Sequence, residues 1–336
     1  MKWLILFPVK KESISAYVRE KMNRWGKSGR PFLFVLDFAL QQPEIFPLDE
    51  ISNKDILFDI QGVKNFSPAA NTKIKPADFR IYPVSKDRYC QAFNQVQKYI
   101  RRGDTFLLNL TMPHRIDTHL NLKQLFFNSK AKYKIWFRDR FVCFSPEIFI
   151  QTQSNLIRSF PMKGTIDARI KNAREKLLAS PKERAEHFTI VDLIRNDLSI
   201  VAKNVKVNRF RYIDHIQTHK NDILQMSSEI EGTIRPEFKK SPGDLLFALL
   251  PAGSISGAPK KKTLEIIRET EKYDRGFYTG IMGIFDGQNI NSGVMIRFIE
   301  KTEKGLVYKS GGGITALSNC EEEYNELIDK IYVPFH

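Results

Sequence analysis

The primary amine of Lys163 is the side chain whose setting most suggests a nucleophile. It lies in the stretch 159–165, where Pro161 restricts the backbone and Gly164 permits a turn conformation that most other residues avoid. A turn of this kind can hold an amine facing a pocket. A solvated loop lysine is the alternative interpretation, so the choice depends on the acidic residues elsewhere in the chain.

Carboxylates three residues apart occur on two predicted helices that are distant in the sequence. Glu183 and Glu186 share one helix face, and Glu323, Glu326 and Lys330 share a face of the last helix. If the two helices meet, their oxygens suit a hard cation such as Mg²⁺, which keeps waters for an anionic substrate. Taken separately, each set could be solvated surface, where an ion pair contributes only about 0.3–0.5 kcal/mol.

Glu147 could supply a proton opposite the amine. It precedes Lys163 by sixteen residues, a gap that an intervening hairpin could close. The amine would have to lose its proton, through desolvation or a nearby cation, and burial would have to raise the pKa of the carboxyl. A surface salt bridge between the two side chains is an equally natural alternative.

Two further features could bind anions. Arg297 lies in an apolar segment that we expect to be a strand, and a buried guanidinium needs a carboxylate or phosphate partner. Gly311, Gly312 and Gly313 could present backbone N–H groups to an anion, or could simply form a hairpin turn.

The hydrophobic patterns predict a strand-rich chain with a few helices. A loop over 251–260 opens a further helix, whose free N–H groups would attract an anion. No repeat or flexible linker is present, so we expect one domain. Strands are predicted over 1–11, 32–38, 55–60, 105–111, 134–138, 140–143, 148–152, 156–159, 294–299 and 306–309, with more within 205–230, and helices over 86–101, 182–202, 242–250 and from Ser318 or Asn319.

Composition restricts the class of protein. The 336 residues, 42% of them hydrophobic, can form a substantial core. The net charge of +15 is spread along the chain, so we expect neither a nucleic acid nor a membrane as partner. Cys90, Cys143 and Cys320 are odd in number and far apart, which predicts no disulfide framework and no zinc site. We expect a cytoplasmic protein in a reducing compartment.

Several motifs, in order, resemble those of the chorismate-binding family, which includes anthranilate synthase, aminodeoxychorismate synthase, isochorismate synthase and salicylate synthase chains. The resemblance implies an α+β fold in which two large, mostly antiparallel sheets pack face to face with helices outside. Residues 1–85 would be an N-terminal strand-rich part of the same domain, and 86–333 the catalytic core. The motifs are SPE at 145–147, PMKGT at 161–165, KERAEH at 182–187, VDLIRNDL at 191–198, PAGSISGAPK at 251–260, YTGIMG at 278–283, IR at 296–297 and GGGI with EEEYNELIDK within 311–330.

The resemblance also implies roles for individual residues. Lys163 would attack chorismate and Glu147 would be the general acid. Three of the carboxylates would bind Mg²⁺ directly, and Glu183 would lie next to them without contacting the ion. The implied magnesium site is Glu183, Glu186, Glu323 and Glu326, and the implied substrate-binding residues are Thr165, Ser254, Tyr278, Arg297, Gly311, Gly312, Gly313 and Lys330.

A lysine at position 163 is typical of aminodeoxychorismate synthase component I, whereas anthranilate synthases usually have alanine there. Leu107 stands near the position where water-activating members have lysine, which weighs against isochorismate and salicylate chemistry. The resemblance thus implies conversion of chorismate and ammonia to 4-amino-4-deoxychorismate through a covalent lysine intermediate. No Gly-x-Cys-x-Gly turn is present, so a separate glutamine amidotransferase subunit would supply the ammonia.

Two alternatives remain at this point, namely an anthranilate synthase component I that carries a lysine, and a basic binding protein without catalysis. Whether the chain is a monomer or a weak dimer is left open.

Overall fold

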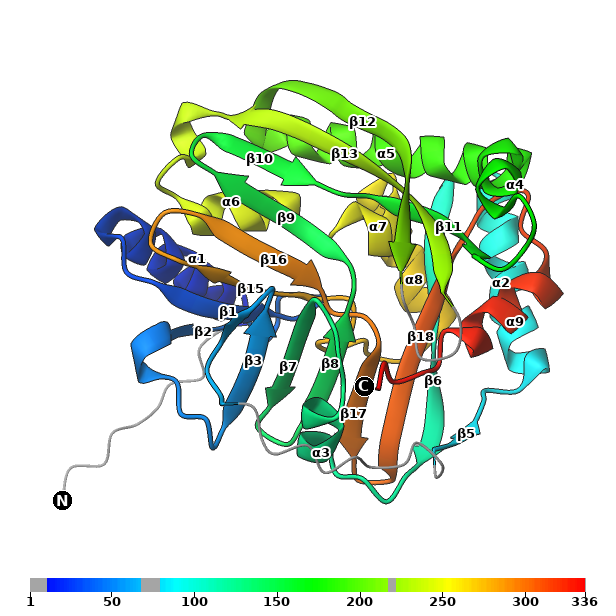
Figure 1. Cartoon of the computed structure of the whole chain (residues 1–336), viewed down its shortest axis with the longest axis horizontal. Coiled ribbons are helices and arrows are strands. Elements are labelled where there is room, and N and C mark those ends of the chain that lie inside the picture. Colours follow the sequence, from blue (N-terminus) through cyan, green and yellow to red (C-terminus); the bar gives the residue numbers. More distant parts are fainter. Residues whose placement is uncertain (1–10, 68–78, 217–221, 336) are drawn as a thin grey trace.

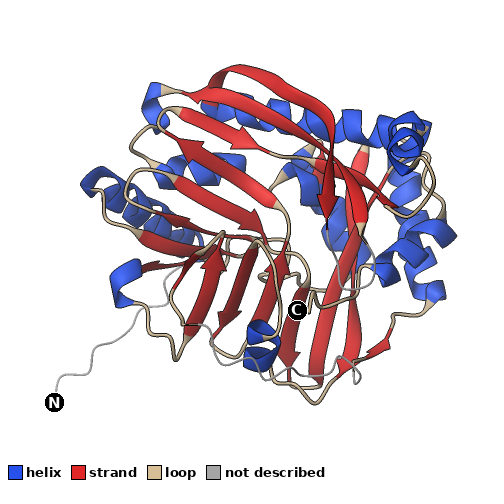
Figure 2. Cartoon of the chain, in the orientation of Figure 1, coloured by secondary structure: helices blue, strands red, loops and turns tan. Residues whose placement is uncertain are grey.

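The computed structural model describes residues 11–67, 79–216 and 222–335. Within them, two antiparallel sheets of nine strands each face one another, and helices cover their outer sides (Figure 1). This is the α+β architecture that the sequence predicts. Figure 2 shows that strands form the interior of the molecule and helices its periphery.

The first sheet contains the strand that carries Lys163. All its pairings are antiparallel, and β1 is buried along its whole length because both faces of the sheet are covered there. In spatial order the strands are β11 (Met162–Asp167), β13 (Ile223–Ile234), β10 (Leu156–Ser159), β9 (Ile148–Gln153), β16 (Ile290–Val294), β15 (Ile281–Phe285), β1 (Phe32–Leu36) and β2 (Glu44–Pro47), with β12 (Ala202–Ile216) paired to β13.

The second sheet contains the glycine run. Its order is β14 (Gly257–Ala258), β6 (Leu107–Asp117), β18 (Gly305–Ile314), β17 (Phe298–Thr302), β8 (Phe141–Ser145), β7 (Tyr133–Phe137), β3 (Ile56–Ile60) and β4 (Val63–Lys64), with β5 (Arg80–Tyr82) paired to β6.

The helices lie on both outer sides of the pair of sheets. They are α1 (Lys11–Ser28), α2 (Lys86–Arg101), α3 (Leu122–Phe127), α4 (Ala173–Ala179), α5 (Pro181–Val201), α6 (Pro242–Leu249), α7 (Gly253–Ser256), α8 (Lys260–Glu271) and α9 (Cys320–Asp329), with short 3₁₀ turns at Leu48–Glu50 and Pro236–Phe238.

The N-terminal part differs from the prediction in one respect. The strand expected over 1–11 falls outside the described residues except for Lys11, which instead begins the 18-residue helix α1. Val18, Met22 and Trp25 of this helix are buried against the first sheet, at the spacing of one helix face. That spacing was available in the sequence and was missed.

The core has two main layers. One lies between the sheets and contains Leu33, Ile135, Phe141 and Met282, from β1, β7, β8 and β15. A second lies between the first sheet and helices α1, α5 and α6. Since both faces of the central strands are covered, these strands read as continuous apolar runs rather than alternating ones.

Two short connections among those that carry the chain from one sheet to the other lie side by side. Residues 146–147 join β8 to β9, and residues 295–297 join β16 to β17. The two crossings are neighbours, because β8 pairs with β17 and β9 pairs with β16. The single strand predicted over 294–299 is therefore wrong. Arg297 lies in the second crossing with a left-handed φ of 54°, a conformation that is uncommon for a residue with a side chain.

A disulfide joins Cys90 of α2 to Cys320 of α9, so the prediction that the cysteines are unpaired is wrong. The two cysteines are separated by 230 residues, and spacing alone cannot reveal such a pairing. Cys143 is free and buried. Among the described helices, none is long and apolar enough to span a bilayer.

Candidate active site

Lys163 lies on β11, the terminal strand of the first sheet. Its Nζ is 2.9 Å from Oε2 of Glu186, and its side chain is 24% exposed, so the amine points into a partly enclosed acidic site rather than into bulk solvent. The pairing of β11 with β13 is interrupted by a bulge between Met162 and Thr165. Gly164 lies in this bulge with a φ of 81°. The turn predicted around Lys163 is thus a bulge within a strand.

The acidic neighbours control the protonation of this amine. Burial by itself lowers the pKa of Lys163, but the charges of Glu186, Glu326 and Glu323 outweigh it and raise the pKa above its usual value. With the carboxylates as they stand, the amine keeps its proton. It can become a nucleophile only when their negative charge is compensated.

Helices α5 and α9 bring the acids together. Ser180 caps α5 by accepting a hydrogen bond from the backbone N–H of Glu183, and Asn319 caps α9 in the same way. Lys182 of α5 reaches α9, with its Nζ 3.1 Å from Oε2 of Glu322 and 3.9 Å from Oε1 of Glu323. The first turns of the two helices therefore face each other.

The carboxylates influence one another. Burial raises the pKa of Glu323, which is only 3% exposed, and the nearby charges of Glu326 and Glu186 raise it further. Burial and the charge of Glu186 likewise raise the pKa of Glu183. Like charges held this close favour either bound protons or a cation among them.

The donor chemistry of this cluster suits Mg²⁺, whereas the arrangement seen is one of ion pairs. Within residues 11–67, 79–216 and 222–335, no three His, Cys, Asp or Glu side chains are placed to hold a metal ion. Glu186 is paired with Lys163, and Oε1 of Glu326 is 2.6 Å from Nζ of Lys330. A cation would have to replace these two lysines as the partner of the carboxylates.

Glu147 occupies the crossing between β8 and β9. The hydroxyl of Ser254 on α7 donates a hydrogen bond of 2.6 Å to its Oε1. Burial raises the pKa of Glu147, and this hydrogen bond and the charges of Arg297, Lys330 and Lys163 reduce the rise. These interactions place the carboxyl in the same site as the two lysines. A raised pKa is what a general acid requires.

Arg297 occupies the neighbouring crossing and lacks an anionic partner. Its guanidinium lies 4.8 Å from the centre of the Tyr332 ring, and its buried Nε has no hydrogen-bond partner. The ion pairs formed among the described residues do not include it. Tyr278 is buried nearby and has a raised pKa because of its burial. A buried guanidinium with a free donor is suited to a carboxylate of a ligand.

The glycine run lies inside β18 and pairs with β6, so the hairpin-turn alternative is wrong. A Cβ at Gly312 would lie 3.5 Å from Oε2 of Glu323, and a Cβ at Gly313 would lie 3.3 Å from Nζ of Lys163. Nζ of Lys330 donates a hydrogen bond of 3.1 Å to the carbonyl of Gly311. The absence of side chains here keeps the space between the two lysines open.

Replacing Gly313 by alanine should therefore reduce turnover while leaving the fold intact. The added Cβ would press on Nζ of Lys163 and, at 3.2 Å, on Cδ1 of Leu107, and displacing the amine should lower the rate roughly 10–100-fold. Lys304→Ala, at an exposed position just before the same strand, is the control for general effects of a substitution. Equal activity of Gly313→Ala and the unmodified protein would contradict this placement.

Thr165 is the one predicted substrate-binding residue that the described structure does not join to the cluster. Its side chain is exposed beyond the bulge. The sequence analysis also missed a buried ion pair between Arg275 and Glu271, with Nη2 2.6 Å from Oε1. Arg275 donates a further hydrogen bond of 2.9 Å to the carbonyl of Ile255, beside Ser254. The spacing of four residues was its only signal in the sequence.

Comparison with known proteins shows the family to which the chain belongs. A family model described as chorismate binding enzyme matches residues 48–335. A Pasteurella multocida protein described as an uncharacterized PabA-like protein is 49% identical over 322 residues, which are 96% of this chain and 99% of that protein.

More distant relatives have named activities. Aminodeoxychorismate synthase component 1 of Bacillus subtilis is 30% identical over 74% of this chain and 55% of its own length. Anthranilate synthase component 1 of Acetivibrio thermocellus is 33% identical over 74% of this chain and 52% of its own length. A Bacillus anthracis structure, described as a putative 2,3-dihydroxybenzoate-specific isochorismate synthase, superimposes with a TM-score of 0.71 at 21% identity, covering 95% of this chain and 87% of that one. It supports the fold.

Proposed function

Because the chain belongs to the chorismate binding enzymes, we propose that it aminates chorismate as an aminodeoxychorismate synthase component I does. The observation that carries this proposal is the position of Lys163, whose amine lies against Glu186 at one side of the site that also holds Glu147. A nucleophile and a general acid in one enclosed site are what a displacement at the chorismate ring needs.

The charges of the site support a dianionic substrate. Chorismate has two carboxylates, one on the ring and one on the enolpyruvyl side chain. Arg297, with its unpaired Nε, is suited to the enolpyruvyl carboxylate, and Lys330 lies beside the glycine strand where the ring carboxylate would approach. Burial lowers the pKa of Lys330, and Glu326 opposes this effect, so an anion at Lys330 also favours its charged form.

The reaction that we propose has two displacements. The neutral amine of Lys163 adds at C2 of chorismate as the C4 hydroxyl leaves, and Glu147 gives that hydroxyl its proton, so that water departs. Ammonia then attacks C4 and expels the lysine nitrogen as the neutral amine. The new ammonium group returns a proton to the Glu147 carboxylate, giving 4-amino-4-deoxychorismate. Chorismate and ammonia are thus converted to aminodeoxychorismate and water, with no redox change.

Glu183, Glu186, Glu323 and Glu326 are the residues that would hold Mg²⁺. When bound there, Mg²⁺ would compensate their charge and provide a Lewis acid for the ring carboxylate. For this the carboxylates must release Lys163 and Lys330, and that release would free the amine for its role.

Chelation tests the proposed metal. Turnover should fall to background in EDTA and return when Mg²⁺ is added. Glu326→Gln should raise the Mg²⁺ concentration that gives half-maximal rate by about tenfold or more, because one carboxylate is lost. Glu322→Gln is a matched control on the same helix, because the side chain of Glu322 is exposed and pairs with Lys182 at the surface. Full activity in EDTA would exclude a required divalent ion.

Product analysis tests the reaction itself. The protein should convert chorismate and ammonium, with Mg²⁺, to a product that a lyase turns into p-aminobenzoate. Formation of anthranilate would instead favour the activity named for the Acetivibrio thermocellus relative. Because relatives are called component 1, we also propose a glutamine amidotransferase subunit as the ammonia source. Glutamine alone should then support turnover only when that subunit is present.

A further inference from the structure

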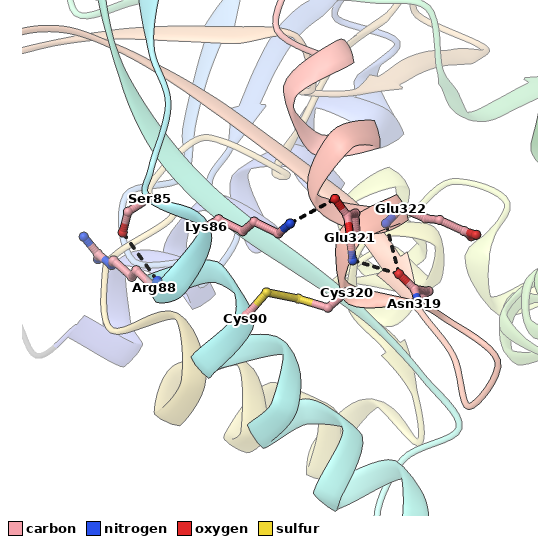
Figure 3. The surroundings of a disulfide bond; sticks show 8 residues. All are labelled: Ser85, Lys86, Arg88, Cys90, Asn319, Cys320, Glu321 and Glu322. Carbon is pink, nitrogen blue, oxygen red and sulfur yellow. Dashed lines mark hydrogen bonds and ion pairs between the residues drawn. A yellow bond between two sulfur atoms is a disulfide. The ribbon is translucent and has the colours of Figure 1, made fainter.

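The disulfide lies at the end of the helix that carries half of the acidic cluster. Cys320 is the first residue of α9, and Cys90 lies in the second turn of α2 (Figure 3). Glu323 and Glu326 follow Cys320 by one and two turns on the same helix. A covalent bond at residue 320 therefore fixes the start of the element that positions both carboxylates.

Apart from the Asn319 cap, the first turn is held by ion pairs at the surface. One joins Lys182 of α5 to Glu322, whose side chains are 38% and 66% exposed. Nζ of Lys86 is 3.0 Å from Oε1 of Glu321, but both side chains are largely exposed, at 49% and 69%, so the ion pair is weak. The residues just before the helix are solvent-facing, with Leu317 76% exposed. Further along, Tyr324 donates a hydrogen bond of 2.8 Å to the carbonyl of Val84, and Leu327 is buried. Loss of the disulfide should loosen α9 from its first turn as far as Glu326, while the buried Leu327 keeps the end of the helix packed.

The same two sulfurs are open to chemistry. Cys90 and Cys320 are both partly exposed, whereas Cys143 is fully buried and its burial raises the pKa of its thiol. Of the three cysteines in the chain, only the disulfide pair can exchange readily with a dissolved thiol.

We propose that the Cys90–Cys320 disulfide is a redox-controlled tether that holds the first turn of α9, and with it Glu323 and Glu326, in the arrangement needed for catalysis. A dithiol reductant opens it by two successive exchanges. The reductant loses two electrons and two protons and becomes a disulfide, while Cys90 and Cys320 become thiols. The effect on turnover rests on the proposed function, whereas the effect on α9 does not.

The test compares the oxidised protein, treated with oxidised glutathione and freed of it, with protein reduced by dithiothreitol. Native alkylation with iodoacetamide, followed by intact mass, should show no modification in the first and two in the second. Hydrogen–deuterium exchange of residues 320–326 should accelerate on reduction. Turnover of chorismate at limiting Mg²⁺ should fall roughly fivefold or more.

Variants distinguish the effect of the disulfide from that of the neighbouring ion pair. Cys90→Ser and Cys320→Ser should each resemble the reduced protein and should no longer respond to dithiothreitol. Lys86→Ala, which removes the neighbouring ion pair but keeps both sulfurs, should retain the full response. Conserved exchange rates in α9 between the oxidised and reduced forms would overturn the proposal, as would alkylation of both cysteines after oxidation. Altered exchange without chorismate turnover in either form would support the tether and contradict the proposed function.

Discussion

Lys163→Ala should abolish the covalent adduct with chorismate and lower amination by about 10³-fold or more, because no other amine can take its place as the attacking group. Lys330 is the other amine of the site, and it is held by Glu326 and by the carbonyl of Gly311. The measurement is twofold. Intact mass after incubation with chorismate and Mg²⁺, without ammonia, detects the adduct, and chromatography of the complete reaction measures the product.

Lys171→Ala is the matched control, because Lys171 is an exposed lysine that follows the same strand. It should give the adduct and the rate of the unmodified protein. If Lys163→Ala kept its full aminating activity, ammonia would be attacking chorismate directly. Lys163 would then serve only to balance the charge of Glu186.

Glu147→Gln should lower turnover by about 10²–10⁴-fold, because the departing hydroxyl loses its proton donor. The amide is nearly the same size and can still accept the hydrogen bond of Ser254, so the fold and chorismate binding should be retained. Glu303→Gln, at an exposed carboxylate, should have no effect on the rate.

The pH dependence distinguishes a general acid from a mere binding group. A general acid must be protonated, and burial raises the pKa of Glu147, so the active form persists to higher pH than for an exposed glutamate. The rate of the unmodified protein should fall as pH rises through that raised pKa. Glu147→Gln should lack this fall, because its amide does not titrate. If the rate of Glu147→Gln fell with pH as that of the unmodified protein does, Glu147 would not be the general acid.

Much of the fold was readable because its strands are buried on both faces. Segments such as 32–38, 134–138 and 140–143 are apolar runs, and each contains a strand in the structure. Helices α2, α5 and α9 begin within two residues of their predicted starts, because Ser85, Ser180 and Asn319 cap them.

The failures arise where long-range contacts decide the structure. Arg297 looked like part of a continuous strand, because hydrophobicity does not change where the chain passes from one sheet to the other. For Gly311–Gly313 the sequence left a turn as an alternative, yet β6 supplies the partner that keeps the glycines extended. The Cys90–Cys320 pair depends on two helices that meet only in the folded chain.

The sequence predicted which residues make up the candidate site, but it did not predict all of the ion pairs that they form. Spacing placed Glu183 with Glu186 and Glu323 with Glu326, and the described structure does bring the two helices together. Spacing also indicated the ion pair of Glu326 with Lys330, but it could not show that Lys163 already neutralises Glu186. Opposite charges that lie close together form ion pairs. The sequence therefore predicts the residues of the site better than the contacts among them.

The position of β1 has a consequence for dissecting the protein. This strand lies between β15 and β2, although the family match begins only at residue 48. A fragment that began at that boundary would lack β1. The strand Ile281–Phe285 would then have an unpaired, apolar edge. Such a fragment should precipitate or self-associate, so soluble expression of the catalytic portion requires residues from Phe32 onward.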